Sequence, residues 1–253
     1  MSEEKVQPKF PSEVIDLPSG GKVYPKESPI SNGKIEIKYM TAREEDILTS
    51  QNLIKKGVVI NKLLNSLILT EGVTCDDLIV GDKNAVMVAA RILAYGPEYT
   101  CEITNPNTGD LVQQTFNLAD CPFRKVETEI TGNAFEFELP ASKTKITFKI
   151  LTGRDEKNIE EELDRLKKLG GLVSPELSTR LKYVVTSVDG EKDNNVIRNF
   201  VDNMLSRDSL SLREYMVTVS PDIELKQEVE LEGDVVTVDI PMTANFFWPN
   251  STT

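Results

Sequence analysis

The sequence predicts an α+β protein built from two tandem, related halves. A stretch reading KIEIKYMTAREE at 34–45 returns as KITFKILTGRDE at 145–156, with six of twelve positions identical. A second pair links PEYTCEITNPNTGDLV at 97–112 with PDIELKQEVELEGDVV at 221–236. The offsets are 111 and 124 residues, so the second half gains thirteen residues in its helical middle, where insertions are well tolerated. Each half is expected to run from a strand through helices to a β-hairpin.

These correspondences divide the chain into five segments. We expect an N-terminal arm at 1–33, a first α+β half at 34–119, a connecting β-hairpin at 120–144, a second α+β half at 145–243 and an aromatic tail at 244–253. A chain of 253 residues can bury a substantial core in one large domain or two small ones.

Each half opens with an alternating apolar strand that meets a helix start. Thr41 stands three residues before Glu44, and Thr152 stands three residues before Asp155, which is the capping-box pattern. Hydroxyl and carboxylate groups at these positions satisfy backbone N–H groups that a helix N-terminus leaves unpaired. A catalytic carboxylate cluster is the alternative, but a junction repeated together with its strand favours structure. We therefore predict that all four residues are structural caps.

Apolar residues at helical spacing predict the helices that follow. In the first half these lie at 58–69 and from Asp82 to Tyr95, where Gly96-Pro97 ends the pattern. In the second half the predicted helices are 158–169, 177–185, 194–205 and 208–219. Gly170-Gly171 ends the first of them, and Ser174-Pro175 provides a cap and a proline at the start of the second.

Strict alternation predicts half-buried hairpins. Ile223, Leu225, Val229 and Leu231 alternate with charged residues before the Gly233-Asp234 turn. Residues 126–139 predict another hairpin, turning at 131–133 and connecting the halves.

Composition excludes several kinds of catalytic chemistry. Histidine is absent, which removes the usual general base near neutral pH and the commonest metal ligand. Residues 19–22, SGGK, lack the spacing and the hydroxyl residue of a phosphate-binding loop. We predict no catalytic residues, and an enzyme that uses only carboxylates and lysines is the competing class. A cleft with convergent, strongly shifted titratable groups would distinguish that class.

The three cysteines predict neither disulfides nor a zinc site. Cys75, Cys101 and Cys121 are odd in number and widely spaced. Only Cys101 lies near the turn at 105–110, whereas a structural zinc site needs four ligands. We predict no metal and no cofactor.

Net charge and hydropathy limit the kinds of partner that this chain is expected to have. A net charge of −12 without a basic stripe predicts no nucleic-acid partner. No apolar run is long enough to cross a bilayer, and the polar start lacks a signal-peptide core, so cytosolic residence is expected.

Two segments are candidate partner-binding sites. Glu228, Glu230 and Glu232 line the polar face of the last hairpin, where they either meet a basic partner or protect an edge strand. The tail residues Phe246, Phe247 and Trp248 either fold back onto the second half's core or anchor a partner. Adjacent Phe246 and Phe247 would point to opposite sides of an extended chain, so one ring is expected to pack elsewhere.

The chain resembles a known family over nearly its whole length. The residues that carry the resemblance are DLPSGGKVYP at 16–25, TAREEDILTSQNLIKKG at 41–57, VGDKNAVMVAARILAYGPEY at 80–99 and IPMTANFFWP at 240–249. They resemble the baseplate-hub protein family of T-even-like, contractile-tailed bacteriophages. The resemblance implies a non-enzymatic hub component or hub assembly factor, with other baseplate hub or tail proteins as partners. It also implies residence in the host cytoplasm during assembly and in the virion tail baseplate, unless the protein is a transient chaperone that never enters the virion. Some relatives carry cysteines at the hairpin turns, which would make this chain one that has lost a zinc site.

Overall fold

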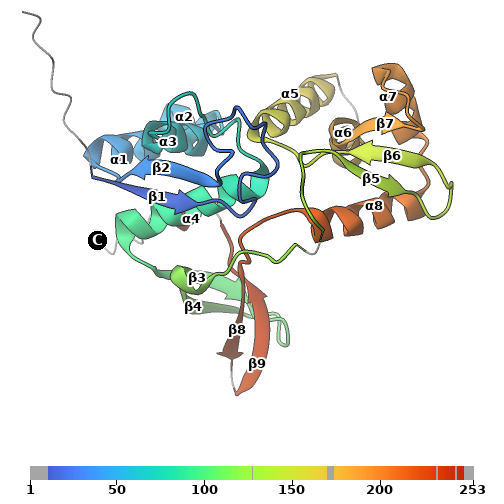
Figure 1. The fold of residues 1–253 in the computed structure, drawn as a ribbon. Coiled ribbons are helices and arrows are strands. Elements are labelled where there is room, and N and C mark those ends of the chain that lie inside the picture. The colour runs from blue at the N-terminus through green and yellow to red at the C-terminus, as the bar shows by residue number, and fades with distance from the viewer. Residues whose placement is uncertain (1–10, 127, 170–173, 232, 243, 248–253) are drawn as a thin grey trace, which may run out of the picture.

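The computed structural model describes residues 11–126, 128–169, 174–231, 233–242 and 244–247. Small antiparallel sheets and hairpins alternate with groups of helices in this part of the chain (Figure 1). The predicted α+β class is confirmed.

The first half contains a strand pair, a helical group and a hairpin. Its elements are β1 Ser12–Asp16, β2 Lys34–Lys38, α1 Ala42–Thr49, α2 Gln51–Lys55, α3 Val59–Leu67, α4 Val80–Tyr95, β3 Glu98–Thr104, β4 Leu111–Asn117 and the short 3-10 helix η1 Leu118–Asp120. β1 pairs antiparallel with β2, aligning Ile15 with Ile35. Part of the segment expected as an arm therefore belongs to the first sheet.

The described part of the second half runs from a strand pair through helices, with an additional strand among them, to a hairpin. Its elements are β5 Phe135–Glu138, β6 Lys145–Phe148, α5 Gly153–Lys168, α6 Glu176–Val184, β7 Val185–Val188, α7 Asn194–Asp202, α8 Ser206–Val219, β8 Lys226–Leu231, β9 Asp234–Asp239 and the 3-10 helix η2 Ala244–Phe247. β5, β6 and β7 form one antiparallel sheet in that order.

The prediction of a connecting hairpin at 126–139 is wrong. β5 pairs with β6, so that Phe135 faces Phe148, and the turn of this hairpin lies at 139–144. β5 thus belongs to the sheet of the second half. The cap predicted at Ser174 is also absent, because α6 begins at Glu176 with Pro175 at the N-cap position and no side-chain cap.

Two hydrophobic cores lie side by side. The first contains residues of the first half together with both C-terminal strands and the tail, among them Leu63, Phe116, Val229 and Phe246. The second lies around the three-stranded sheet, α6, α7 and α8 of the second half, and it also contains Val23 and Ile79 from the first part of the chain. The last hairpin therefore packs on the core of the first half, although it follows the second half in sequence.

A buried aspartate at the third position of a helix occurs in both halves. In α4, Asp82 is fully buried and accepts hydrogen bonds from the Ser19 backbone N–H at 2.9 Å and from the Ser19 hydroxyl at 2.6 Å. It thereby holds the connection between β1 and β2. Burial raises the pKa of Asp82, although the hydrogen bonds from Ser19 and Tyr24 oppose the shift.

The counterpart in α8 is Asp208, which is 1% exposed. Its carboxylate accepts hydrogen bonds from the backbone N–H groups of Ala141 at 2.7 Å and Ser142 at 3.0 Å. Asp208 therefore holds the turn between β5 and β6, as Asp82 holds the connection between β1 and β2.

Backbone pairing joins the two halves at the start of α5. The Gly153 N–H donates to the Leu78 carbonyl at 2.8 Å, and Ile79 bridges Thr152. A Cβ atom at Gly153 would lie 2.5 Å from the Cys75 carbonyl oxygen. This contact explains why glycine stands where the first half has Ala42.

Replacing Gly153 by alanine is expected to lower the free energy of unfolding by about 2 kcal/mol, because the added methyl forces the backbones of the two halves apart. An unobstructed helical site would respond in the opposite direction, since alanine is favoured over glycine by about 1 kcal/mol. Urea denaturation measures the change, with Ala42→Gly as the control at the equivalent position. A stabilised Gly153→Ala variant would contradict the close approach.

Candidate interaction surface

Two hairpins extend side by side from the same side of the body (Figure 1). β3 pairs with β4, and β8 pairs with β9, each in an unbroken antiparallel register. Glycines with positive φ serve both turns: Gly109 at φ 80° and Gly233 at φ 92°. Both predicted hairpins are confirmed.

Apolar packing and polar contacts hold the hairpins together. Their inward-facing residues belong to one core: Tyr99, Ile103, Phe116, Val229, Leu231, Val236 and Val238. The Gln227 side-chain amide donates to the Asn117 carbonyl at 3.0 Å, and near the tips Asn107 donates to Asp234 at 3.4 Å. The two hairpins thus present one continuous surface.

The outer face of β8–β9 is acidic. Alternation places Glu228 and Glu230 on this face, and the register adds Asp239 opposite Lys226. All four are exposed. Glu232 lies outside the described residues. The three described carboxylates outnumber the single lysine, so this face can attract a basic protein surface.

The two phenylalanines of the tail are buried rather than exposed. Phe246 and Phe247 are each 1% exposed, and their ring centroids lie 5.3 Å apart at 89°. Because η2 is helical rather than extended, both rings enter the same core, contrary to the expectation that one would pack elsewhere. That core belongs to the first half, not to the second half as expected. Trp248 lies outside the described residues.

Arg91 of α4 holds the described part of the tail in place, a role that no sequence pattern predicts. It is 4% exposed, and its Nε donates to the Phe246 carbonyl at 2.9 Å. Its terminal nitrogens donate to the carbonyls of Gly96 at 3.2 Å and Glu98 at 3.3 Å. One side chain of α4 therefore joins the tail to the start of the β3–β4 hairpin.

The guanidinium of Arg91 also lies beside aromatic rings. Its carbon is 4.9 Å from the Tyr95 ring centroid and 5.8 Å from that of Tyr99. These distances permit cation–π attraction. Burial lowers the pKa of Arg91, while Tyr95 and Tyr99 oppose the shift. The cation is thus stabilised by carbonyl oxygens and ring faces.

The predicted caps lie at two equivalent strand-to-helix junctions, apart from the hairpins. Glu44 accepts from the Thr41 backbone N–H at 3.0 Å, and Asp155 accepts from that of Thr152 at 3.0 Å. Each acid also forms an ion pair at 2.7 Å with a nearby lysine: Glu44 with Lys38, the last residue of β2, and Asp155 with Lys149, the residue after β6. These two carboxylates are engaged in helix capping and ion pairing.

Glu44 is expected to make stability sensitive to acid. Burial alone would raise its pKa, but hydrogen bonds from Lys38 and Thr41 outweigh burial and lower it. Its contribution is therefore complete above the ordinary glutamate pKa of about 4.3 and is lost as pH falls through the lowered value. Glu44→Gln should lose about 2 kcal/mol at pH 7 and show a smaller further loss on acidification. Urea denaturation at several pH values checks this, and parallel pH profiles for variant and parent would contradict it.

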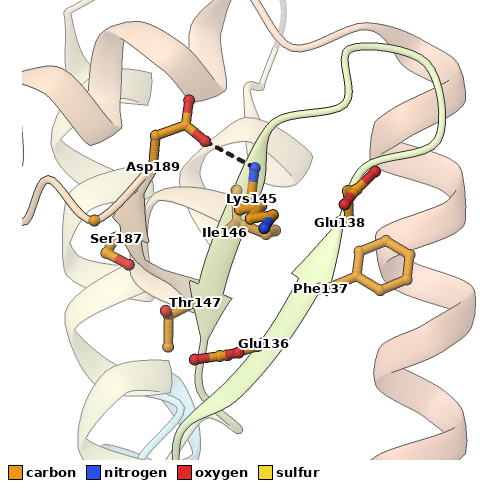
Figure 2. Close-up of a pocket in the computed structure, with 9 residues that line it drawn as sticks. Glu136, Phe137, Glu138, Lys145, Ile146, Thr147, Ser187 and Asp189 are labelled. Carbon is orange, nitrogen blue, oxygen red and sulfur yellow. Dashed lines mark hydrogen bonds between the residues drawn. The ribbon is translucent and has the colours of Figure 1, made fainter.

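A hollow of about 480 Å³ lies on the open polar face of the β5–β6–β7 sheet (Figure 2). Glu136, Glu138, Lys145 and Asp189 contribute its charged groups. Asp189 accepts a hydrogen bond from the Lys145 backbone N–H at 2.9 Å, the dashed line in Figure 2. One of its three carboxylates is therefore engaged in holding the start of β6 beside the end of β7.

The described residues contain no group of three or more histidine, cysteine or acidic side chains arranged to hold a metal ion. Burial raises the pKa of the Cys75 thiol to about 11, and burial also raises the pKa of Cys101 and Cys121. None of these thiols is therefore activated as a nucleophile. Within the described parts of the chain, no helix has the length and apolar character needed to cross a bilayer.

Comparison with known protein families gives a match over almost the whole chain. The family model described as T4 bacteriophage base plate protein matches residues 10–248, which include both hairpins and the buried Phe246 and Phe247. The chain belongs to this family. No curated protein and no solved structure matches it.

Membership of the base plate family indicates a structural or assembly role at the phage tail baseplate, in contact with other tail proteins. The resemblance seen in the sequence is confirmed at this level. Its hub-specific part stays a prediction.

Proposed function

We propose that the chain is a non-enzymatic component or assembly factor of the central baseplate hub, and that it acts through the acidic outer face of β8–β9. The observation that carries this proposal is the exposed set of Glu228, Glu230 and Asp239 on a hairpin that extends from the body (Figure 1). Family membership supports the baseplate setting.

An acidic face on a hairpin suits attraction of a basic partner. Complementary charge raises the rate of encounter and orients the partner, while apolar contacts supply most of the affinity. Val235, which is 71% exposed on the same face, offers such a contact. Because the Debye length is about 8 Å at physiological ionic strength, added salt should slow association.

The other explanation of the acidic face is protection of an edge strand against unwanted pairing. The exposed face of the neighbouring β3–β4 hairpin also carries two acids, Glu98 and Glu102, beside the uncharged Thr100, Gln113 and Thr115. Exposed charge on both hairpins fits either explanation, so the effect of charge reversal on tail assembly separates them.

The competing enzyme class requires a cleft with shifted titratable groups. The acid with a raised pKa, Asp82, is fully buried, and its oxygens accept hydrogen bonds from Ser19 and Tyr24. It has no path to a substrate in this structure. This arrangement supports an interaction protein.

Residence in the mature tail and transient chaperone action are separated by mass spectrometry of purified virions. We propose residence, because the body, hairpins and tail form two extensive cores suited to a permanent subunit. Peptides of this chain should occur in particles at a constant ratio to other baseplate proteins. Their absence from infectious particles, together with failure of tail assembly when the chain is missing, would establish the chaperone role instead.

We also propose that the halves arose by duplication of one unit. The support is their shared order of a strand pair, a capped helix with a lysine–acid pair, a helix with a buried aspartate, and a hairpin. The revised units begin at β1 and β5 rather than at 34 and 145. Superposition of an experimental structure should bring Thr41 onto Thr152 and Asp82 onto Asp208 together, and unrelated settings for these pairs would contradict duplication.

A further inference from the structure

A groove of about 500 Å³ lies between the first turns of α6 and the corner formed by α7 and α8. This volume falls within the range of about 300–1,000 Å³ that is typical of ligand pockets. Leu181 and Val201, each 4% exposed, lie at its base with Met204. Leu177, 46% exposed, lies at its edge. The groove therefore offers an apolar surface that a small side chain can cover.

One wall of the groove is a polar stripe of α8. Ser206, Ser209 and Arg213 recur at helical spacing and all line the groove. Ser209 is 7% exposed, and its hydroxyl makes no hydrogen bond within the described part of the chain. Buried polar groups are normally paired, so an unpaired hydroxyl in a groove wall points to a missing polar partner.

The same wall carries positive charge. The Nε of Arg213 donates to the Ser209 carbonyl at 3.3 Å, and the guanidinium forms no ion pair with any described residue. α8 begins after Leu205 without a side-chain cap, so the N–H groups of its first turn add partial positive charge. An acceptor with negative charge would satisfy both the hydroxyl and the guanidinium.

We propose that this groove binds the C-terminal residue of a partner protein, with an apolar side chain on Leu181, Val201 and Met204 and the carboxylate at Ser209 and Arg213. The apolar base of the groove complements an apolar side chain, and the hydrogen-bond donors in its wall complement a carboxylate. A C-terminal apolar residue carries both groups. Glu176 on the opposite side disfavours a doubly charged phosphate. The groove lies at the beginning of α8, whereas the β8–β9 hairpin follows its end (Figure 1), so this site is separate from the proposed acidic surface.

The test uses N-acetyl-leucine as the probe and N-acetyl-leucinamide as the uncharged control, with the full chain and backbone amide NMR. The carboxylate form should shift the amides of 206–213 and of α6 saturably, with a Kd on the order of 1 mM for so small a ligand. The amide form should bind at least about tenfold more weakly, because it lacks the charge-assisted hydrogen bonds.

Variants locate the binding. Arg213→Gln and Ser209→Ala should each weaken N-acetyl-leucine binding several-fold, whereas Arg207→Gln, the same charge change on an exposed part of α8 outside the groove, should leave it unchanged. Spectral dispersion of each variant reports whether it is folded.

Three outcomes with N-acetyl-leucine and its amide, and one with inorganic phosphate, would overturn the proposal. The first three come from the acid, the amide and the variants. They are equal binding of acid and amide, equal weakening by Arg207→Gln and Arg213→Gln, and absence of saturable shifts up to about 10 mM. Inorganic phosphate that produces the same shifts more strongly than N-acetyl-leucine would also overturn it, because the apolar base would then make no contribution.

Discussion

Replacing Phe246 by alanine is expected to lower the free energy of unfolding by about 4 kcal/mol. The Phe246 ring is 1% exposed and meets the edge of Tyr99 at a centroid distance of 5.0 Å. Its loss removes buried apolar surface and leaves a cavity between the tail and the first core, which the surrounding side chains fill only in part.

The control for this change is Phe123→Ala. Phe123 is 42% exposed, so the same truncation should cost about 1 kcal/mol. Urea denaturation of the two variants and the parent measures the difference. Equal losses for the two phenylalanines would show that the tail is not packed as described and would reopen its role as an exposed partner anchor.

The second large effect is expected from Arg91→Met, with a loss of about 3 kcal/mol. Methionine keeps an unbranched apolar stem but removes the donors to the carbonyls of Phe246, Gly96 and Glu98. Each carbonyl left without a partner costs about 1–3 kcal/mol, and relief of the buried charge offsets part of the sum. The tail should also become accessible to proteases earlier in denaturation than the rest of the chain.

Arg154→Met is the matched comparison for Arg91. Arg154 is 67% exposed and pairs with Asp77 at the surface, an interaction worth less than about 1 kcal/mol. If the two arginine variants lose the same stability, Arg91 does not hold the tail.

Local patterns predicted most of the elements because their causes lie within a few residues. The starts of α1 and α5 follow from a threonine and an acid three residues apart, and both C-terminal strands follow from alternation before Gly233. β7 was missed because Val185–Val188 continues the apolar pattern of α6 with no proline or glycine between them.

Long-range features were not predictable in the same way. The turn between β5 and β6 is held by Asp208, more than sixty residues away, so the glycine at 132 gave a better local turn signal than the true turn. Lys143, at φ 61°, adopts a left-handed conformation in that turn which its residue type does not suggest.

The acidic face of the candidate site was predicted, but its setting was not. Alternation located Glu228 and Glu230, since side-chain direction in a strand depends only on parity. The packing of this hairpin against β3–β4 was not predictable, because it depends on contacts between segments more than 100 residues apart, such as that of Gln227 with Asn117. No sequence pattern predicts the role of Arg91. Its hydrogen-bond partners are backbone carbonyls, which every residue type has.

The central claim is that the acidic face of β8–β9 acts in tail assembly, and charge reversal on two matched strands tests it most directly. Glu228→Lys with Glu230→Lys reverses the proposed surface, whereas Glu136→Lys with Glu138→Lys makes the same change on the exposed strand β5. Both pairs are solvent-exposed, so both double variants should fold with nearly parental stability.

The measurement is the yield of complete tails when each variant replaces the parent chain in its phage, with variant expression and thermal stability determined in parallel. We expect the β8 variant to lower tail yield at least about tenfold, because two repulsive charges at a complementary interface cost several kcal/mol, and the β5 variant to assemble normally. Normal assembly with the β8 variant, or equal loss with both variants, would contradict the claim.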